Sequence, residues 1–147
     1  MRRSRLVCIT TIAGLSFTLA ACGSSDKKAA EPAPAASGGA IAVSLKEFSV
    51  SPAAAETAAG SVSFDVKNEG KVVHEMVVVK LADGAGLDSI TKPDGTASED
   101  ASVGEAADIE PGATKSTTID LKAGTYALIC NLPGHFTGGM KTVFTVK

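Results

Sequence analysis

The chain of 147 residues contains no tryptophan, one tyrosine and five phenylalanines, so a core must be built mainly from Val, Ile, Leu and Ala. It has three cysteines, and two of them, Cys8 and Cys22, lie within or at the end of an apolar N-terminal run. Only Cys130 is left for a folded part, which excludes a disulfide within that part. A lone cysteine in an exported protein calls for intermolecular pairing, a reactive thiol or a metal ligand.

Basic residues are scarce outside the N-terminus. Arg2, Arg3 and Arg5 are the only arginines, and residues 1–21 contain no acid. Without that segment, 11 basic residues face 16 acidic ones, a formal charge of -5. No basic patch remains to neutralise phosphates, so nucleic acid is not expected as a partner.

Residues 1–21 have the pattern of a signal peptide, because a basic start precedes an apolar run too short and too interrupted to span a membrane comfortably. The end of this run, Leu19-Ala20-Ala21-Cys22, resembles the lipobox of bacterial lipoproteins. That resemblance implies cleavage before Cys22 and lipid attached to its sulfur. The protein would then be extracytoplasmic and lipid-anchored to the bacterial cell membrane. Ordinary cleavage at small residues, or a retained anchor helix, are the alternatives.

The composition of the remaining chain divides it into two parts, residues 22–40 and residues 41–147. Residues 22–40 are mostly Ser, Ala, Pro, Gly and Lys, which bury too little to offset the entropy of ordering, so we expect a flexible tether. From Ile41 onward the pattern is that of short strands, and residues 41–147 are expected to form one domain. Helical periodicity is absent there, and strands at this spacing are typical of an all-β sandwich or barrel.

Alternation of apolar and polar residues locates the strands. It begins at Ile41 and resumes at Phe48 out of phase, which predicts a bulge or bend near Lys46-Glu47. The further strand-like runs are residues 62–66, 72–81, 117–121, 125–130 and 142–147. Of these, 117–121 and 125–130 are expected to pair across residues 122–124.

The stretch from Ala82 to Pro111 is rich in Gly, Ser and acidic residues, with Lys92 as its one base. We expect this stretch to be a solvated connection between strands, because runs of charged residues usually form such segments. The alternatives are an organised insertion beside a functional site or an acidic docking surface for a basic partner.

The residues that carry chemistry gather near the C-terminus. Cys130 ends an apolar strand, His135 follows across a Pro-Gly turn, and Met140 precedes the last strand. A second histidine, His74, is supplied from far upstream. Two histidine nitrogens and a cysteine thiolate with a weak axial methionine form the ligand set of a blue-copper site.

Other chemistries fit these residues less well. A structural zinc site more usually has four strong ligands, often in paired Cys-x-x-Cys units, and the sequence has none. Nucleophilic catalysis by Cys130 with His135 or His74 as base lacks an orienting partner and an oxyanion-hole pattern. Met76 shares strand parity with His74 and is expected to fill the core.

The segment Cys130-Asn-Leu-Pro-Gly-His135, separated from Met140 by four residues and preceded by residues 124–129, resembles the copper-binding loop of the cupredoxins. Its spacings are more similar to those of rusticyanin, sulfocyanin and auracyanin than to those of plastocyanin. Residues 66–70 and 73–79 are similar to the family segment that supplies the first histidine. The resemblance implies a Greek-key β-sandwich with one type 1 copper ion, His74, Cys130 and His135 as equatorial ligands and Met140 as the axial one. One departure is Glu75, where many cupredoxins have an asparagine that helps to hold the copper-binding loop.

The resemblance also implies a function. We expect a non-enzymatic, membrane-tethered monomer that shuttles single electrons between transient redox partners by alternating Cu(I) and Cu(II). The edge of His135 is expected to emerge through an apolar surface made by Leu132, Pro133 and Phe136. The alternative is an extracytoplasmic protein for copper trafficking or buffering, although the exposed Met-rich or His-rich tracts that favour this role are absent from the sequence.

Overall fold

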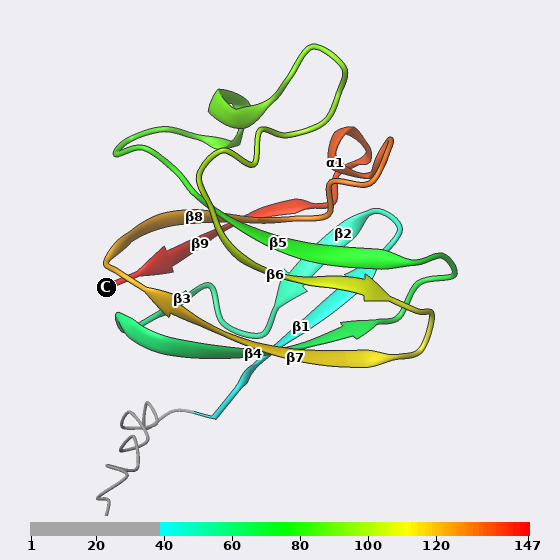
Figure 1. Ribbon diagram of the computed structural model, residues 1–147, viewed down its shortest axis with the longest axis horizontal. Helices are drawn as coiled ribbons and strands as arrows, with labels where there is room; N and C mark the ends of the chain where they lie inside the picture. The colour runs from blue at the N-terminus through cyan, green and yellow to red at the C-terminus, as the bar shows by residue number, and fades with distance from the viewer. Residues whose placement is uncertain (1–38) are drawn as a thin grey trace, which may run out of the picture. The chain divides into compact units, whose positions relative to one another are not determined.

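The strands of residues 39–147, the part of the chain that the computed structural model describes, form two packed sheets (Figure 1). The expected signal peptide and nearly all of the expected tether, including Cys22, lie outside the described residues. The first sheet has the order β2 (Ser49–Pro52), β1 (Ile41–Lys46), β4 (Gly60–Asn68) and β7 (Thr114–Leu121). The second has the order β3 (Glu56–Thr57), β9 (Lys141–Val146), β8 (Gly124–Ile129), β5 (His74–Lys80) and β6 (Ser102–Ile109). The predicted all-β sandwich is confirmed.

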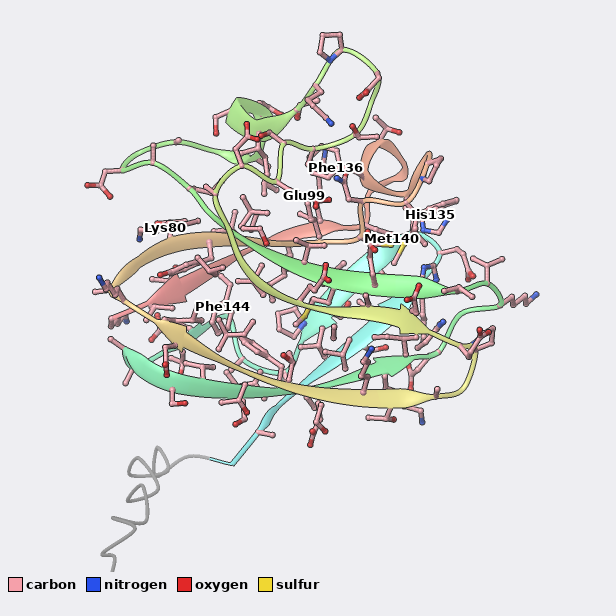
Figure 2. The ribbon with its side chains drawn as sticks, viewed as in Figure 1. Lys80, Glu99, His135, Phe136, Met140 and Phe144 are labelled. Atoms are coloured by element: carbon pink, nitrogen blue, oxygen red, sulfur yellow. The ribbon has the colours of Figure 1, made fainter. Side chains whose placement is uncertain are left out.

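The main core lies between the two sheets because one face of each strand is apolar. In β4, Val62, Phe64 and Val66 are buried and alternate with partly exposed polar residues. Phe64 packs edge-on against Phe144 of β9, with 5.6 Å between ring centroids. Figure 2 shows Phe144 between the sheets. Core aromatics therefore join the two sheets directly.

A smaller apolar cluster lies apart from the main core and explains why β5 is buried on both faces. Alternate residues Val77 and Val79 belong to this cluster, whereas Met76 and Val78 belong to the main core. Ala97 and the partly buried Leu87 and Ile90 belong to it too, from the segment between β5 and β6. That segment contains the 3-10 helix η1 (Leu87–Ile90).

The expectation of a solvated connection over residues 82–111 was therefore wrong. The first part of the stretch, which contains η1 and Ala97, packs on the second sheet as an organised insertion. The second part forms β6, an edge strand paired with β5. The sequence pattern did not predict β6, because Ala106 and Ile109 are the only buried apolar residues of this strand. The small side chain of Ala106 gives a weak alternation signal.

Of the bulge or bend expected near Lys46-Glu47, the structure contains a bend in the form of a hairpin turn, since Lys46 pairs with Ser49 and β2 runs antiparallel to β1. A second expectation needs correction. Residues 117–121 and 125–130 do not pair with each other, because β7 lies in the first sheet and β8 in the second. Tyr126 fixes this crossing between sheets by donating its buried hydroxyl to the carbonyl of Lys122, at 2.8 Å.

Helix is confined to η1 and the single turn α1 (His135–Gly138) among the described residues. Within residues 39–147, no helix has the length and apolar character needed to cross a membrane. The turn α1, the β1–β2 turn and the start of β5 meet at one end of the sandwich (Figure 1).

Candidate metal centre

The loop between β8 and β9 is shaped by its own backbone hydrogen bonds. Cys130 donates its N–H to the carbonyl of Met140 at 2.9 Å, and Met140 donates to the carbonyl of His135 at 3.0 Å. Gly134 and Gly139 have φ values of 81° and 119°, a region that glycine enters without strain. Cys130, His135 and Met140 are thus held in one short loop, as the sequence predicted.

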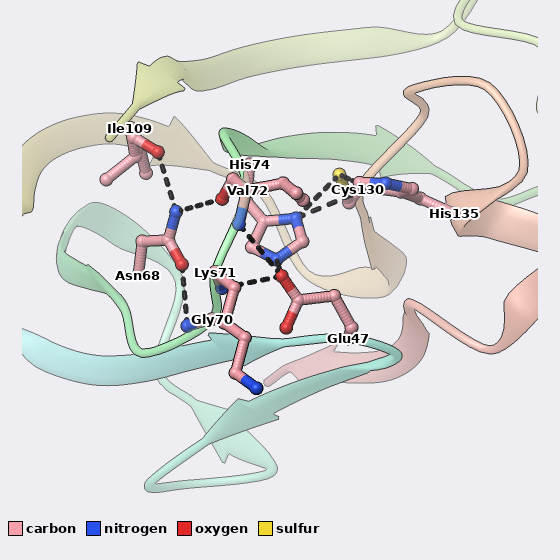
Figure 3. Close-up of polar contacts among 9 residues, drawn as sticks. All are labelled: Glu47, Asn68, Gly70, Lys71, Val72, His74, Ile109, Cys130 and His135. Carbon is pink, nitrogen blue, oxygen red and sulfur yellow. Dashed lines mark hydrogen bonds and ion pairs between the residues drawn. The ribbon is translucent and has the colours of Figure 1, made fainter. Parts of the chain in front are cut away.

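Asn68 positions His74 from the other side of the site. Its fully buried side chain donates to the carbonyls of Val72 (2.7 Å) and Ile109 (2.8 Å) and accepts the N–H of Gly70 (2.8 Å). These bonds fix the loop between β4 and β5 (Figure 3). Sequence analysis assigned no role to Asn68 beyond its place in the family-like segment 66–70, because the bond to Ile109 exists only in the folded chain.

The structure brings three predicted ligands together. Nδ1 of His135 lies 3.3 Å from Sγ of Cys130 and 3.3 Å from Nδ1 of His74, and the third distance, from Sγ to Nδ1 of His74, is 3.8 Å. In both rings Nδ1 is the nitrogen that faces the sulfur, and Figure 3 shows these contacts as dashed lines. These donor atoms face one another, and the backbone N–H groups of Glu75 and Leu132 also point to the sulfur of Cys130.

Burial makes the charged forms of these side chains unfavourable unless a cation is bound to them. His74 and Cys130 are fully buried, whereas His135 is partly exposed. Burial lowers the pKa of His74, against the opposing effect of Glu47, and burial raises the pKa of the Cys130 thiol. Both shifts disfavour the charged side chains. A metal ion would bind the thiolate and the two lone pairs at once, so the residues present fit a copper ion well.

Met140, the fourth predicted residue, is also fully buried. It belongs to the main core cluster together with Cys130, and Figure 2 shows it beside His135. Its backbone bonds to Cys130 and His135 hold it in the same loop as these two residues. Met76 is buried in the main core, as expected for a residue that fills space.

Glu75, the departure from the family pattern, links the two strands that carry ligands. Its carboxylate accepts the N–H of Asn131, the residue after Cys130, at 3.0 Å. Burial raises the pKa of Glu75, and the nearby carboxylate of Glu99 adds to the rise, while the N–H of Asn131 opposes it. A carboxylate thus occupies the place where many cupredoxins use an amide to hold the loop.

Asn131 in turn attaches the insertion to the site. Its side chain accepts the N–H of Ala97 at 2.6 Å and donates to the carbonyl of Ala97 at 3.0 Å. The same amide donates to the carboxylate of Glu99. The insertion is therefore joined directly to the residue that follows Cys130.

The β1–β2 turn supplies two residues that sequence analysis missed. Oε1 of Glu47 lies 3.3 Å from Nε2 of His74, and the ring of Phe48 packs edge-on against His135 with 5.8 Å between centroids. The backbone N–H of Lys71 above all, with that of Val72 among lesser causes, lowers the pKa of Glu47 to about 2. The sequence indicated a bulge or bend here, but no pattern indicated that Glu47 or Phe48 would contact the histidines.

The apolar surface beside His135 also differs from the expectation. Phe136 is fully buried in the smaller apolar cluster, where the ammonium of Lys141 lies 4.2 Å from its ring centre. Phe48, which is 51% exposed, provides the aromatic surface that was expected from Phe136. Leu132 is partly exposed and Pro133 exposed, as expected.

Comparison with known proteins agrees with this geometry. The family model of the cupredoxin-like domain matches residues 11–143. No curated protein sequence matches the chain significantly.

Solved structures of blue-copper proteins have a similar fold. Auracyanin from the photosynthetic bacterium Roseiflexus castenholzii is 24% identical, with a TM-score of 0.54 over 74% of this chain and 96% of that one. Auracyanin A, described as a blue copper protein from the green thermophilic photosynthetic bacterium Chloroflexus aurantiacus, is also 24% identical, with a TM-score of 0.54 over 74% and 98%. Rusticyanin from Thiobacillus ferrooxidans is 18% identical, with a TM-score of 0.51 over 76% and 79%. These likenesses establish the two-sheet sandwich.

Proposed function

Because the chain belongs to the cupredoxin-like domain family, we propose that it carries single electrons between redox proteins through one type 1 copper ion. The family consists of electron carriers rather than enzymes, and the observation that carries the proposal is the convergence of His74, Cys130 and His135. A mixed set of thiolate and imidazoles, with a methionine beside it, is the donor chemistry of blue copper.

Each residue has a distinct part in this proposal. His74 and His135 offer Nδ1, and Cys130 offers a thiolate that burial shields from solvent. Met140 would offer its thioether as the fourth and weaker donor. Copper supplies the one-electron chemistry by alternating between Cu(I) and Cu(II).

The sandwich keeps the donors in one geometry during transfer. Cys130 follows a central strand of the second sheet, His74 begins the neighbouring strand, and backbone hydrogen bonds close the loop that carries His135. A site that scarcely rearranges between oxidation states transfers electrons with little reorganisation of its surroundings.

Electrons would enter and leave near His135. It is the only one of the four proposed ligands with exposed surface, and Phe48, Leu132 and Pro133 provide apolar surface next to it. Such docking surfaces are typically small and bind partners weakly, so a monomer with transient redox partners is the expected form.

A visible spectrum of the domain from Ile41 onward, loaded with Cu(II) and then reduced with ascorbate, tests the proposal. An intense blue or green band that bleaches reversibly is expected for thiolate-bound copper. Stoichiometric binding without an intense band would point to copper trafficking or buffering instead. Absence of binding would refute the copper site.

We further propose that the chain is tethered to the outer face of a bacterial cell membrane through lipid on Cys22. The support is the sequence Leu19-Ala20-Ala21-Cys22 after a basic and apolar leader. The full chain expressed in a bacterial host should fractionate with membranes and incorporate a labelled fatty acid. A Cys22→Ser variant should lose the label, and a Cys8→Ser control should keep it. Equal labelling of both variants would contradict the anchor.

A further inference from the structure

We propose that the β1–β2 turn, residues 46–49, is a clamp on both histidines, in which Glu47 is a positioning residue for His74. Glu47 would hold His74 in its Nε2–H form and lower the reduction potential of the copper site. This inference rests on the proposed function and adds a specific carboxylate to it.

The first support is the contact itself. Nε2 of His74 is completely buried and has no well-formed hydrogen bond, and its nearest charged partner is Oε1 of Glu47 at 3.3 Å (Figure 3). A buried N–H without a partner destabilises the folded protein, so this nitrogen favours a nearby acceptor. The carboxylate is the acceptor that the structure provides.

The carboxylate is itself fixed. Oε1 of Glu47 accepts the backbone N–H of Lys71 at 2.7 Å and of Val72 at 3.0 Å. These donors belong to the loop that leads into His74. Glu47 therefore holds the backbone before His74 and the imidazole of His74 with the same oxygen.

Gly70 makes room for this pair. A Cβ at position 70 would lie 2.7 Å from Nε2 of His74 and 2.7 Å from Oε1 of Glu47, closer than real Cβ atoms approach other atoms. Any side chain at this position would therefore push the two groups apart. The close contact between Glu47 and His74 therefore explains why position 70 is a glycine.

Phe48 anchors the other side of the turn. Its ring contacts His135, and a Cβ at Gly138 would lie 2.7 Å from that ring. A Cβ at Gly139 would lie 3.1 Å from the carbonyl oxygen of Phe48. The turn thus fits against the loop of His135 through two glycines and against the loop of His74 through a third.

The consequence for the metal follows from histidine chemistry. With the proton on Nε2, the lone pair of Nδ1 points to Cys130 and His135, where the ion would bind. A carboxylate on the far nitrogen makes the imidazole a stronger donor and places negative charge near the ion. Both effects favour Cu(II) over Cu(I).

Glu47→Gln tests this with little change in shape, because the amide oxygen can still accept the two backbone N–H groups. The variant should keep the intense absorption band, and its Cu(I)/Cu(II) ratio at a fixed applied potential should rise about tenfold, equal to 59 mV. Glu69→Gln is the matched control, since Glu69 is a nearby carboxylate that pairs with Lys46 and makes no contact with either histidine. Its ratio should change less than about twofold. Equal shifts in both variants, or no shift in Glu47→Gln, would overturn the proposal.

A second measurement needs no copper. Nitrogen-15 NMR of the metal-free wild type should show His74 protonated at Nε2 and unprotonated at Nδ1. Glu47→Ala should mix the two neutral forms, and His135 should keep its wild-type shifts. An Nδ1–H form, or mixed forms in the wild type, would refute the role of Glu47 even if the copper spectrum is as proposed. Failure of the wild type to give the absorption band would refute the proposed function instead.

Discussion

The two histidines of the site differ in their surroundings, and this difference divides their work. His74 is fully buried and has a carboxylate at its far nitrogen, whereas His135 is partly exposed and has the ring of Phe48 at its edge. His74 is therefore suited to setting the properties of a bound metal. His135 is suited to passing electrons to a partner.

Met140→Leu tests the axial role at the scale of a residue. Leucine fills a similar buried volume but removes the soft sulfur, so the copper should stay bound to the other three residues and the potential should rise. Volume-conserving swaps of this kind cost less than about 1.5 kcal/mol in stability. Metal analysis and redox titration check the result, with Met76→Leu as the control from the core. Loss of the metal from Met140→Leu would show that the assigned axial role is wrong.

Phe64→Ala separates the core from the site. Phe64 is fully buried against Phe144, and removal of a buried phenylalanine ring costs about 3–5 kcal/mol. Denaturant unfolding should show this loss, while the absorption band of the copper-loaded domain keeps its position. The exposed Val103→Ala should leave stability within about 0.5 kcal/mol of the wild type. A shifted band in Phe64→Ala would mean that the core and the site are coupled.

At the scale of elements, the copper-binding loop and the insertion form one structure because Asn131 binds both. Asn131→Ala removes three hydrogen bonds from its side chain to Ala97 and Glu99. Each is worth about 1 kcal/mol net, so we expect a loss of about 1–3 kcal/mol. Hydrogen exchange at the N–H of Ala97 should accelerate more than the average of the sheet. Thr96→Ala, which breaks a contact to Asp94 within the insertion, should leave exchange at Ala97 nearly unchanged.

How well the sequence predicted the structure differs from one element to the next. The spacing from Cys130 to Met140 is local, so it predicted a loop that the structure contains. The contact of Glu47 with His74 and the bond of Asn68 to Ile109 each span more than twenty residues, and no local pattern predicts them. The edge strand β6 escaped prediction because Ala106 buries little area, and the crossing of β7 to β8 was read as a hairpin because its turn is short.

The whole domain should lose stability in acid through its paired carboxylates. A hydrogen bond from Ser44 and the charge of Lys46 lower the pKa of Glu69, and the hydroxyl of Thr96 lowers the pKa of Asp94. Because the folded pKa lies below the unfolded value, this stabilisation is complete above about pH 4.5 and is lost as the pH falls through the folded pKa.

Urea unfolding of the metal-free domain at neutral pH and at about pH 3 measures this loss. Glu69→Gln should make the decrease smaller, because the unfolded chain then has one carboxylate fewer that gains a proton on unfolding. Asp83→Asn, an exposed acid outside these pairs, serves as the control. An unchanged decrease in Glu69→Gln would contradict the assignment.

Metal binding should stabilise the whole molecule, because the donor atoms converge only when the sandwich is folded. His74 begins β5 and Cys130 follows β8, so an ion held by both would resist separation of two central strands. An ion present at about 100 times its Kd adds about 2.7 kcal/mol if the unfolded chain does not bind it. For a domain of this size we expect Tm to rise by about 10 °C when Cu(I) is added under ascorbate. Cys130→Ser should lose most of this rise, while Met76→Leu should keep it. An equal rise in Cys130→Ser would mean that the ion binds elsewhere, and the thiolate would then have no part in holding it.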